Sequence, residues 1–347
     1  MPTMPIHRLQ GYICRMIRYL LMVVLAVGGT VAQGQTTDSL RREATSMLKA
    51  GDYGNAMILL SKALAAEPNN ADIRKELAMA CYHGGYFKQG YDAVKPLVEK
   101  NDADEQAFQI TGMLCKESGD LKEAERIYKA GIKKFPGYGP LYADYGEMLE
   151  QRRPGYGDAA NVWEKGIEMT PSYPGNYYHA ARYYASQDEW IWAVVYGEVF
   201  VNLESYSVRT PEIKELLYDG YQKLMGGGLR LKMKSSFEKE VANIFTQQGD
   251  LINKGVNPET LVAIRTRFIL NWFDGPGKKM PYRLYDMHRL LLQEGLFEAY
   301  NQWLFGSVAD LPAYQNWTSR HSDVMKAFYE YQRARVFQIP AGQYYKF

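Results

Sequence analysis

Apolar and small residues recur along this chain at spacings of three and four, which place them on one face of a helix. The pattern is clearest over residues 105–138. The residues expected to share a buried face are Phe108, Thr111, Gly112 and Cys115 on a first helix, and Ala124, Tyr128 and Gly131 on a second. The turn Gly119-Asp120-Leu121 separates the two helices, and Pro136 ends the second. The pattern predicts a helical hairpin of 34 residues.

The same pattern returns in phase on both sides of this stretch. Hairpins are expected over residues 37–70, 71–104, 105–138, 139–173 and 174–207, with one extra residue in the turn at 152–157. Their order of large, small and aromatic positions with a closing Pro resembles the tetratricopeptide repeat. The resemblance implies an all-α fold, a right-handed α-α superhelix (solenoid) whose first helices line a concave groove.

Residues 208–347 keep helical periodicity without a recognisable family motif, and Gly226-Gly227-Gly228 is their clearest break. We expect a helical C-terminal region that packs on the five hairpins of residues 33–207 or extends them. Trp192 and Tyr196 fall on the outward side of the second helix of the fifth hairpin. Either the C-terminal helices cover these two rings or the rings form an exposed patch. We expect coverage, because bare rings would make an exported protein prone to stick.

Residues 1–32 are typical of a secretory signal peptide. Three arginines precede an apolar run from Leu20 to Val27 and the small residues Thr30-Val31-Ala32, so cleavage is expected after Ala32. A membrane anchor is the alternative, but a span needs about twenty apolar residues and this run is shorter. We therefore expect a periplasmic or secreted protein without a transmembrane span in the mature chain. Association with the cell envelope stays open.

Removal of the signal also changes the charge balance. Cleavage takes away three of the 41 basic residues and no acidic one, which leaves 38 basic residues against 39 acidic ones. A nearly neutral chain has no general attraction to nucleic acid or to anionic lipid. Nucleic acid is therefore not an expected partner.

Cys81 and Cys115 are the two cysteines of the mature chain, and they occupy the same core position in adjacent repeats. Equivalent positions on packed neighbours lie about 8–10 Å apart, whereas a disulfide needs Cα atoms within about 7 Å. Although export would place the chain in an oxidising compartment, we expect two buried free thiols.

No pattern in the sequence indicates catalysis. The serine nucleophile elbow, the phosphate-binding loop, the paired-histidine zinc helix and the calcium loop are absent from the sequence. The mature histidines, which are interpreted as structural or surface residues, are His83, His179, His288 and His321. Glu147 and Glu150 could act on a sugar bond, but an acidic pair three residues apart is usually a solvated helix face. We expect neither an enzyme nor a cofactor nor a metal.

Binding is better supported, because the repeat register names the side chains that face the groove. They mix long polar groups with tyrosine, which suits an extended peptide held by hydrogen bonds and aromatic contacts. The candidate groove residues are Arg41, Asp72, Lys75, Tyr82, His83, Gln106, Gln109, Lys116, Glu147, Glu150, Tyr178 and Arg182. Repeat proteins that hold a chaperone's carboxylate use a Lys/Asn/Arg set. Arg41 is followed by Thr45 where that set has Asn, so this specificity is not carried over.

Three functions follow as hypotheses. The first is an exported scaffold that recognises a protein or peptide partner in its groove. The second is glycan or peptidoglycan binding through the aromatic C-terminal region, and the third is an enzyme within residues 208–347. Loss of a partner in a Lys75→Ala/Tyr82→Ala variant would favour the groove, whereas loss only in a Trp303→Ala/Trp317→Ala variant would favour the C-terminal region.

Overall fold

The structure is a computed structural model that describes residues 37–100, 103–155, 157–226, 233, 235–253 and 255–343. All regular elements in these ranges are helical, which confirms the all-α solenoid with a helical C-terminal region. The expected signal peptide and Gly227-Gly228 lie outside the described residues. Among the helices that are described, none combines the length and the apolar character needed to cross a membrane.

The chain divides into two compact units, one ending at Ile127 and the other beginning at Tyr128. The division falls within helix α6 (Leu121–Lys134), the second helix of the third hairpin. It therefore does not coincide with residue 207, where the repeat pattern ends. The two units are described separately below.

The N-terminal unit consists of helices that pack on their sequence neighbours. Its elements before α6 are a helix over residues 37–49, α2 (Tyr53–Ala66), α3 (Ala71–Gly84), α4 (Phe87–Val98) and α5 (Glu105–Glu117). Asn70 and Asp104 cap α3 and α5 by accepting hydrogen bonds from backbone N–H groups. The first helices end at Gly51, Gly85 and Gly119, whose φ angles of +77°, +77° and +85° favour glycine. Local sequence thus sets the pitch of the repeat.

Small residues let these helices approach closely. A Cβ atom on Gly90 of α4 would lie 2.8 Å from a Leu114 methyl group and 2.9 Å from the Cys81 Cβ atom, so a larger residue would separate α3, α4 and α5. Cys81 and Cys115 are buried and free, as the spacing argument predicted. Burial raises the pKa of the Cys81 thiol to about 11 and that of Cys115 to about 12, the latter helped by Glu123.

The C-terminal unit begins with two more hairpins. They are formed by α7 (Gly139–Arg152) with α8 (Asp158–Met169) and by α9 (Pro174–Ser186) with α10 (Trp190–Leu203). The first helices start at Gly139 and Pro174, which are the residues that open the fourth and fifth repeats in the sequence. In the fifth turn Asp188 takes the left-handed conformation, with φ +57°.

Helices continue to the end of the described chain. They are α11 (Thr210–Met225), α12 (Ser236–Thr246), α13 (Gly249–Ile252), α14 (Pro258–Asp274), η1 (Pro276–Lys278), α15 (Arg283–Gln293), α16 (Phe297–Asn301), the π-helical η2 (Gln302–Gly306), α17 (Ser307–Ala309), α18 (Leu311–Arg320) and α19 (Ser322–Ala334). The sequence analysis did not anticipate α18. It begins where Asp310 accepts a hydrogen bond from the Ala313 N–H and Pro312 occupies the first turn.

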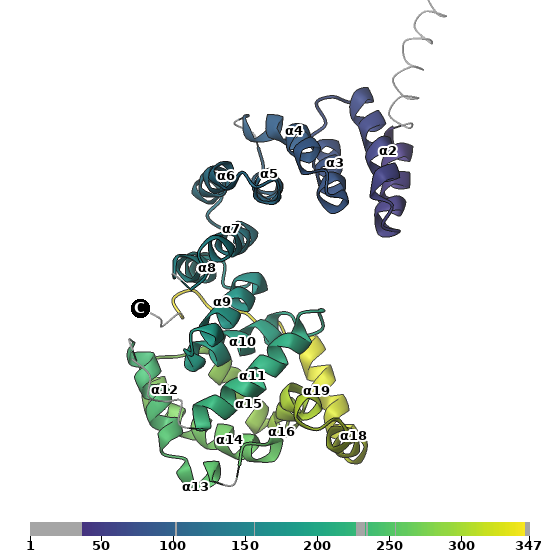
Figure 1. Cartoon of the computed structure of the whole chain (residues 1–347). Helices are drawn as coiled ribbons and strands as arrows, with labels where there is room; N and C mark the ends of the chain where they lie inside the picture. The colour runs from purple at the N-terminus through teal and green to yellow at the C-terminus, as the bar shows by residue number, and fades with distance from the viewer. Residues whose placement is uncertain are drawn as a thin grey trace, which may run out of the picture. The chain divides into compact units, whose positions relative to one another are not determined.

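The C-terminal helices cover the outward face of α10. Figure 1 shows α11 and the later helices gathered beside it, and α10 contacts both α11 and α12. Trp192 and Tyr196 are each 2% exposed, and the Trp192 indole N–H donates to Glu238 Oε1 at 2.7 Å. Trp192 also stacks on Phe237, with ring centroids 5.4 Å apart. The predicted coverage of both rings is confirmed.

Candidate functional site

In the N-terminal unit, Arg41 and Lys75 form ion pairs between successive repeats, and a third predicted groove residue, Asp72, pairs with Lys75 within α3. Arg41 donates two hydrogen bonds to the Glu76 carboxylate, at 2.6 and 3.1 Å. Lys75 Nζ lies 2.6 Å from Asp104 and 3.1 Å from Asp72. These contacts join α3 to the helix over residues 37–49 and to the start of α5, so they stabilise the stack whether or not a ligand is present.

The remaining predicted residues of this unit differ in how available they are. His83 is exposed, and its ring lies between Tyr53 at 5.5 Å and Tyr82 at 5.4 Å. Gln106 is exposed and Gln109 is half-buried on α5. The Lys116 side chain is largely buried and pairs with Glu117 at 3.2 Å. A pocket beside Met57, Ile58 and Tyr86 in this unit contains none of the predicted groove residues, so they stay predictions as ligand contacts.

In the C-terminal unit, the structure brings three predicted residues to one pocket of about 290 Å³. Glu147 and Glu150 come from α7, and Arg182 comes from α9. The pocket, called the α7–α9 pocket below, is completed by Gln151, Trp163, His179, Tyr183 and Ser186. First helices of consecutive repeats thus contribute side chains to one hollow.

An aromatic stack forms the floor of the α7–α9 pocket. The Trp163 ring of α8 lies parallel to the His179 ring, with centroids 5.3 Å apart, and meets Tyr183 edge-on at 6.1 Å. The Trp163 indole N–H donates to the Ala143 carbonyl at 3.1 Å. A Cβ atom on Gly146 would lie 2.3 Å from that indole nitrogen, so glycine at this position makes room for the ring. The floor is therefore fixed by packing before any ligand arrives.

Carboxylates dominate the charge around this floor. The Arg182 guanidinium is paired with Glu212 of α11 at 2.8 Å. Glu150 accepts a hydrogen bond from the neutral Gly155 N–H at 3.0 Å, a contact that leaves its charge uncompensated. Burial raises the pKa of Tyr183, and Glu150 together with two further glutamates raises it more. The pocket therefore favours a cation over an anion.

Tyr178, the other predicted residue of this unit, does not line the pocket. It is 9% exposed and donates its hydroxyl hydrogen to Glu212 at 2.6 Å. The Arg182 and Arg209 guanidinium groups lie over its ring, at 5.2 and 4.7 Å from the centroid. Tyr178 therefore joins α9 to α11.

Sequence reasoning missed the aromatic floor. Trp163 occupies an ordinary core position of the repeat and is 2% exposed, and His179 was interpreted as structural. The sequence did hold a signal for this floor. Trp163, with the largest side chain of the hairpin, faces Gly146, the residue without a side chain.

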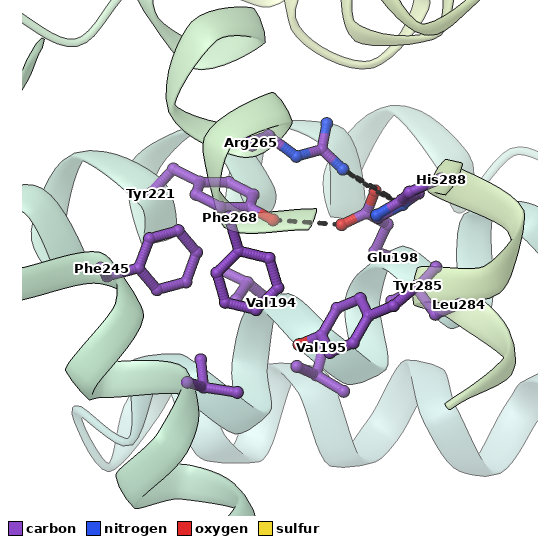
Figure 2. Close-up of a pocket in the computed structure, with 11 residues that line it drawn as sticks. Val194, Val195, Glu198, Tyr221, Phe245, Arg265, Phe268, Leu284, Tyr285 and His288 are labelled. Atoms are coloured by element: carbon purple, nitrogen blue, oxygen red, sulfur yellow. Dashed lines mark hydrogen bonds and ion pairs between the residues drawn. The ribbon is translucent and has the colours of Figure 1, made fainter. Parts of the chain in front are cut away.

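The sequence analysis also missed a buried polar cluster in the C-terminal unit, shown in Figure 2. Glu198 of α10 pairs with Arg265 of α14 and accepts from His288 of α15 at 2.8 Å. Tyr300 of α16 and Tyr221 of α11 donate to the same carboxylate at 2.8 and 3.2 Å. Five helices therefore meet at one carboxylate. His288, interpreted from the sequence as a structural or surface residue, has a structural position here.

The charge state of the cluster follows from its surroundings. Burial alone would raise the pKa of Glu198, but the Arg265 and His288 charges and the donated hydrogen bonds hold it at about 2. Burial lowers the pKa of His288 more than Glu198 raises it. The adjoining cavity of about 10 Å³ has room for about one water molecule. A carboxylate beside a guanidinium and an imidazole could serve a reaction, but here the group has no space for a substrate.

The fold is a series of helical repeats, and the α7–α9 pocket lies between consecutive first helices. Residues 47–114 match the model of the tetratricopeptide repeat family, so the chain contains tetratricopeptide repeats in this part. It is 36% identical over 79 residues to a TPR-containing protein of Dictyostelium discoideum. That match covers 23% of this chain and only 6% of the relative.

Parts of the chain are also similar to solved structures. One is a thermophilic TPR protein of Thermus thermophilus, with 16% identity over 52% of this chain and 98% of that one, at a TM-score of 0.44. Another is pilF of Pseudomonas aeruginosa, with 17% identity over 55% of this chain and 86% of that one, at a TM-score of 0.44. Likeness at this level does not extend to partners.

Proposed function

We propose that the protein is an exported, non-catalytic scaffold that binds an extended peptide segment of a partner protein along the first helices of its repeats. Tetratricopeptide repeats serve protein–protein interaction in general. The α7–α9 pocket carries the proposal, because side chains of two successive first helices line it above a prearranged aromatic floor. Its volume of about 290 Å³ is close to the lower end of the range for ligand pockets.

The pocket chemistry favours a peptide with a basic side chain. Glu147 and Glu150 supply the carboxylates, and Arg182 is occupied by Glu212. A Lys or Arg of the peptide would meet these carboxylates beside the Tyr183 ring, whose face attracts a cation. The flanking peptide would follow the first helices, as extended ligands do in a solenoid.

A displayed library of random linear peptides, selected on the mature chain, tests the proposal. We expect enriched peptides to share a Lys or Arg and to lose at least about tenfold in affinity in the Glu147→Gln/Glu150→Gln variant, since about 1.4 kcal/mol corresponds to tenfold. Glu215→Gln, on the exposed face of α11, is the matched control and should bind as the wild type. Peptides that bind both variants equally would contradict the proposal.

Export is tested separately. The full chain, expressed in a bacterial host with its own N-terminus, should appear in the periplasmic or secreted fraction. N-terminal sequencing should then find Gln33 as the first residue. An intact N-terminus retained in the membrane would favour an anchor and would leave the peptide-binding test unaffected.

A further inference from the structure

A second pocket, of about 420 Å³, lies in the C-terminal unit, and neither the repeats nor the buried cluster accounts for it. It is formed where the start of α14, the π-helical turn η2 and the helix α18 meet. We call it the C-terminal pocket. The residues used in the argument are Asn257, Gln302, Gly306, Tyr314, Trp317 and His321. Its volume falls within the range of small-molecule sites.

Gln302 points to a ligand. Its side chain is 5% exposed and lines the pocket, yet none of the hydrogen bonds among the described residues involves its amide. The amide nitrogen and oxygen are thus not taken up by hydrogen bonds within the described chain, and they can meet a group in the pocket that both accepts and donates. Gln302 also opens the π-helical turn Gln302–Gly306, a conformation that is rare and frequent at functional sites.

Glycine and tyrosine hold this amide at the pocket wall. A Cβ atom on Gly306 would lie 2.6 Å from the Gln302 amide oxygen and 2.4 Å from the Tyr314 ring. Only glycine therefore leaves space for the amide beside the ring. The π-helical turn, the glycine and the tyrosine form one local arrangement whose effect is to present Gln302 to the pocket.

An aromatic stack forms another part of the pocket wall. The Trp317 and His321 rings stack with centroids 4.4 Å apart and an interplanar angle of 18°. The Trp317 indole N–H donates to Glu298 Oε1 at 3.0 Å, and His321 Nδ1 lies 2.9 Å from the Trp317 carbonyl. Trp317 is half-exposed, whereas the other five tryptophans of the chain are buried. The aromatic surface is thus held in place and accessible.

We propose that the C-terminal pocket binds a neutral sugar ring of an oligosaccharide. Such a ring has an apolar C–H face that suits an aromatic surface, and a rim of hydroxyl groups that both donate and accept. Amides carry both functions as well. Gln302 supplies one, and the side chain of Asn316, which is exposed and makes no hydrogen bond with the described residues, supplies another.

A phosphorylated or otherwise anionic ligand fits less well. Glu259 and Asp310 line the pocket together with the single cation Arg320, so negative charge predominates among the lining residues. Anions usually bind the free N–H groups of helix N-termini. Here the Thr260 N–H of α14 donates to Asn257 and the Ala313 N–H of α18 donates to Asp310, both at 2.9 Å.

Of the predicted pair Trp303 and Trp317, Trp317 lines the C-terminal pocket and Trp303 does not. Trp303 is 4% exposed, with Lys214 Nζ 3.9 Å from its ring centroid. Truncation of Trp303 would damage the packing of α11 and say nothing about a ligand.

The test uses the mature full chain against an array of neutral oligosaccharides that includes cellohexaose, mannohexaose and chitohexaose, with heparin fragments as anionic probes. We expect at least one neutral oligosaccharide to bind and to change tryptophan emission, because Trp317 is the accessible tryptophan. Trp317→Ala and Gln302→Ala should each reduce affinity at least about tenfold. Trp317→Phe, which keeps an aromatic face, should retain most of it, and Leu311→Ser, exposed on the same helix, should leave it unchanged.

Three results would overturn the proposal. They are an array without any bound neutral oligosaccharide, binding that persists in both Trp317→Ala and Gln302→Ala, and preferential binding of the heparin fragments. Selection of peptides whose binding depends on Trp317 would assign the pocket to a protein partner instead. Thermal unfolding curves of each variant, matched to the wild type, guard against loss of binding through loss of fold. The Glu147→Gln/Glu150→Gln variant should bind the oligosaccharide normally, so the two proposals fail independently.

Discussion

Helices α2 and α10 are both fourteen-residue second helices of a repeat hairpin, yet their surroundings differ. In α2 four residues are buried and Ile58, its sixth residue, is 55% exposed. In α10 every residue from Trp190 to Asn202 is buried, and Val195, again the sixth, is 3% exposed. The repeat specifies the face that packs inside the hairpin. The chain that follows decides whether the other face meets water or protein.

The same contrast holds for charge. The N-terminal unit joins its helices with half-exposed ion pairs such as Arg41 with Glu76. The C-terminal unit joins them through the fully buried Glu198 and Arg265. Half-exposed pairs contribute little and are screened by salt, whereas a buried charge that loses its partner is very costly. Substitutions in the two units should therefore differ in effect by several kcal/mol.

The largest expected effect is at Glu198. Glu198→Ala leaves Arg265 buried without its carboxylate and should lower the free energy of unfolding by about 3–5 kcal/mol, whereas Arg41→Ala should cost about 1 kcal/mol or less. Since all six tryptophans lie after Ile127, urea titration followed by tryptophan fluorescence reports on the C-terminal unit. Unfolding of the Arg41→Ala variant is followed by far-UV circular dichroism instead. Equal costs at the two sites would contradict the contrast between buried and half-exposed pairs.

The second largest loss of stability is expected when the buried Trp192 ring is removed. Trp192→Ala should cost about 3 kcal/mol or somewhat more, because it deletes the contact with Phe237 and leaves Glu238 without its indole donor. Ile58→Ala, on the open face of α2, should change stability by no more than about 0.5 kcal/mol. Calorimetric unfolding of both variants measures the difference. A large cost at Ile58 would mean that this face is also covered.

Lys214 in the C-terminal unit and Lys75 in the N-terminal unit should affect stability with opposite signs. Burial lowers the pKa of Lys214 to about 8. The cost of its charge is therefore present in full below pH 8 and is relieved as the pH rises toward 10.5. Lys214→Met should thus raise stability at pH 7 by about 1 kcal/mol, less than the pKa shift alone implies, because the bond to the Trp303 carbonyl is lost.

Lys75 should behave in the opposite way. Burial alone would lower its pKa, but its bonds to Asp104 and Asp72 raise the pKa overall. Its charge therefore contributes stability below pH 10.5, and Lys75→Met should cost about 0.5–1 kcal/mol at pH 7. The free energy of unfolding of both lysine variants, measured at pH 7, should rise for Lys214→Met and fall for Lys75→Met. A stabilising Lys75→Met would show that the interrepeat ion pair adds nothing.

The last prediction concerns how the stability of the fold changes at acid pH. Because burial lowers the pKa of His288, the unfolded chain takes up this proton first as the pH falls below about 6.5. Stability should then decline by at most about 1.4 kcal/mol per pH unit. Glu198, with its pKa at about 2, adds a loss below pH 4.5. His288→Asn should flatten the curve between pH 7 and pH 5, and a curve identical to wild type would contradict this assignment.

Much of the fold could be predicted from local sequence, because turns and caps act within a few residues. The helices that start at Ala71, Glu105, Gly139 and Pro174 coincide with the predicted repeats. Coverage of Trp192 was also predictable, because a bare ring on an apolar helix is unfavourable.

The site was predictable only in part. Opposite charges on neighbouring first helices can meet a ligand or one another, and the sequence does not say which of these Lys75 does. Glu198, the single charged residue of the apolar helix α10, was a signal that the sequence analysis passed over. Its pairing with Arg265 joins residues 67 positions apart in the chain, beyond any local pattern.

The covering of α10 bears on how the chain is made. Glu198 accepts from Tyr300, 102 residues later, and Asn202 accepts from Arg335, 133 residues later. During synthesis α10, the most apolar helix of the described chain, is made long before the segments that cover it. A nascent or prematurely terminated polypeptide therefore exposes an aggregation-prone helix. A polypeptide that stops before these segments should therefore be less soluble than the full chain.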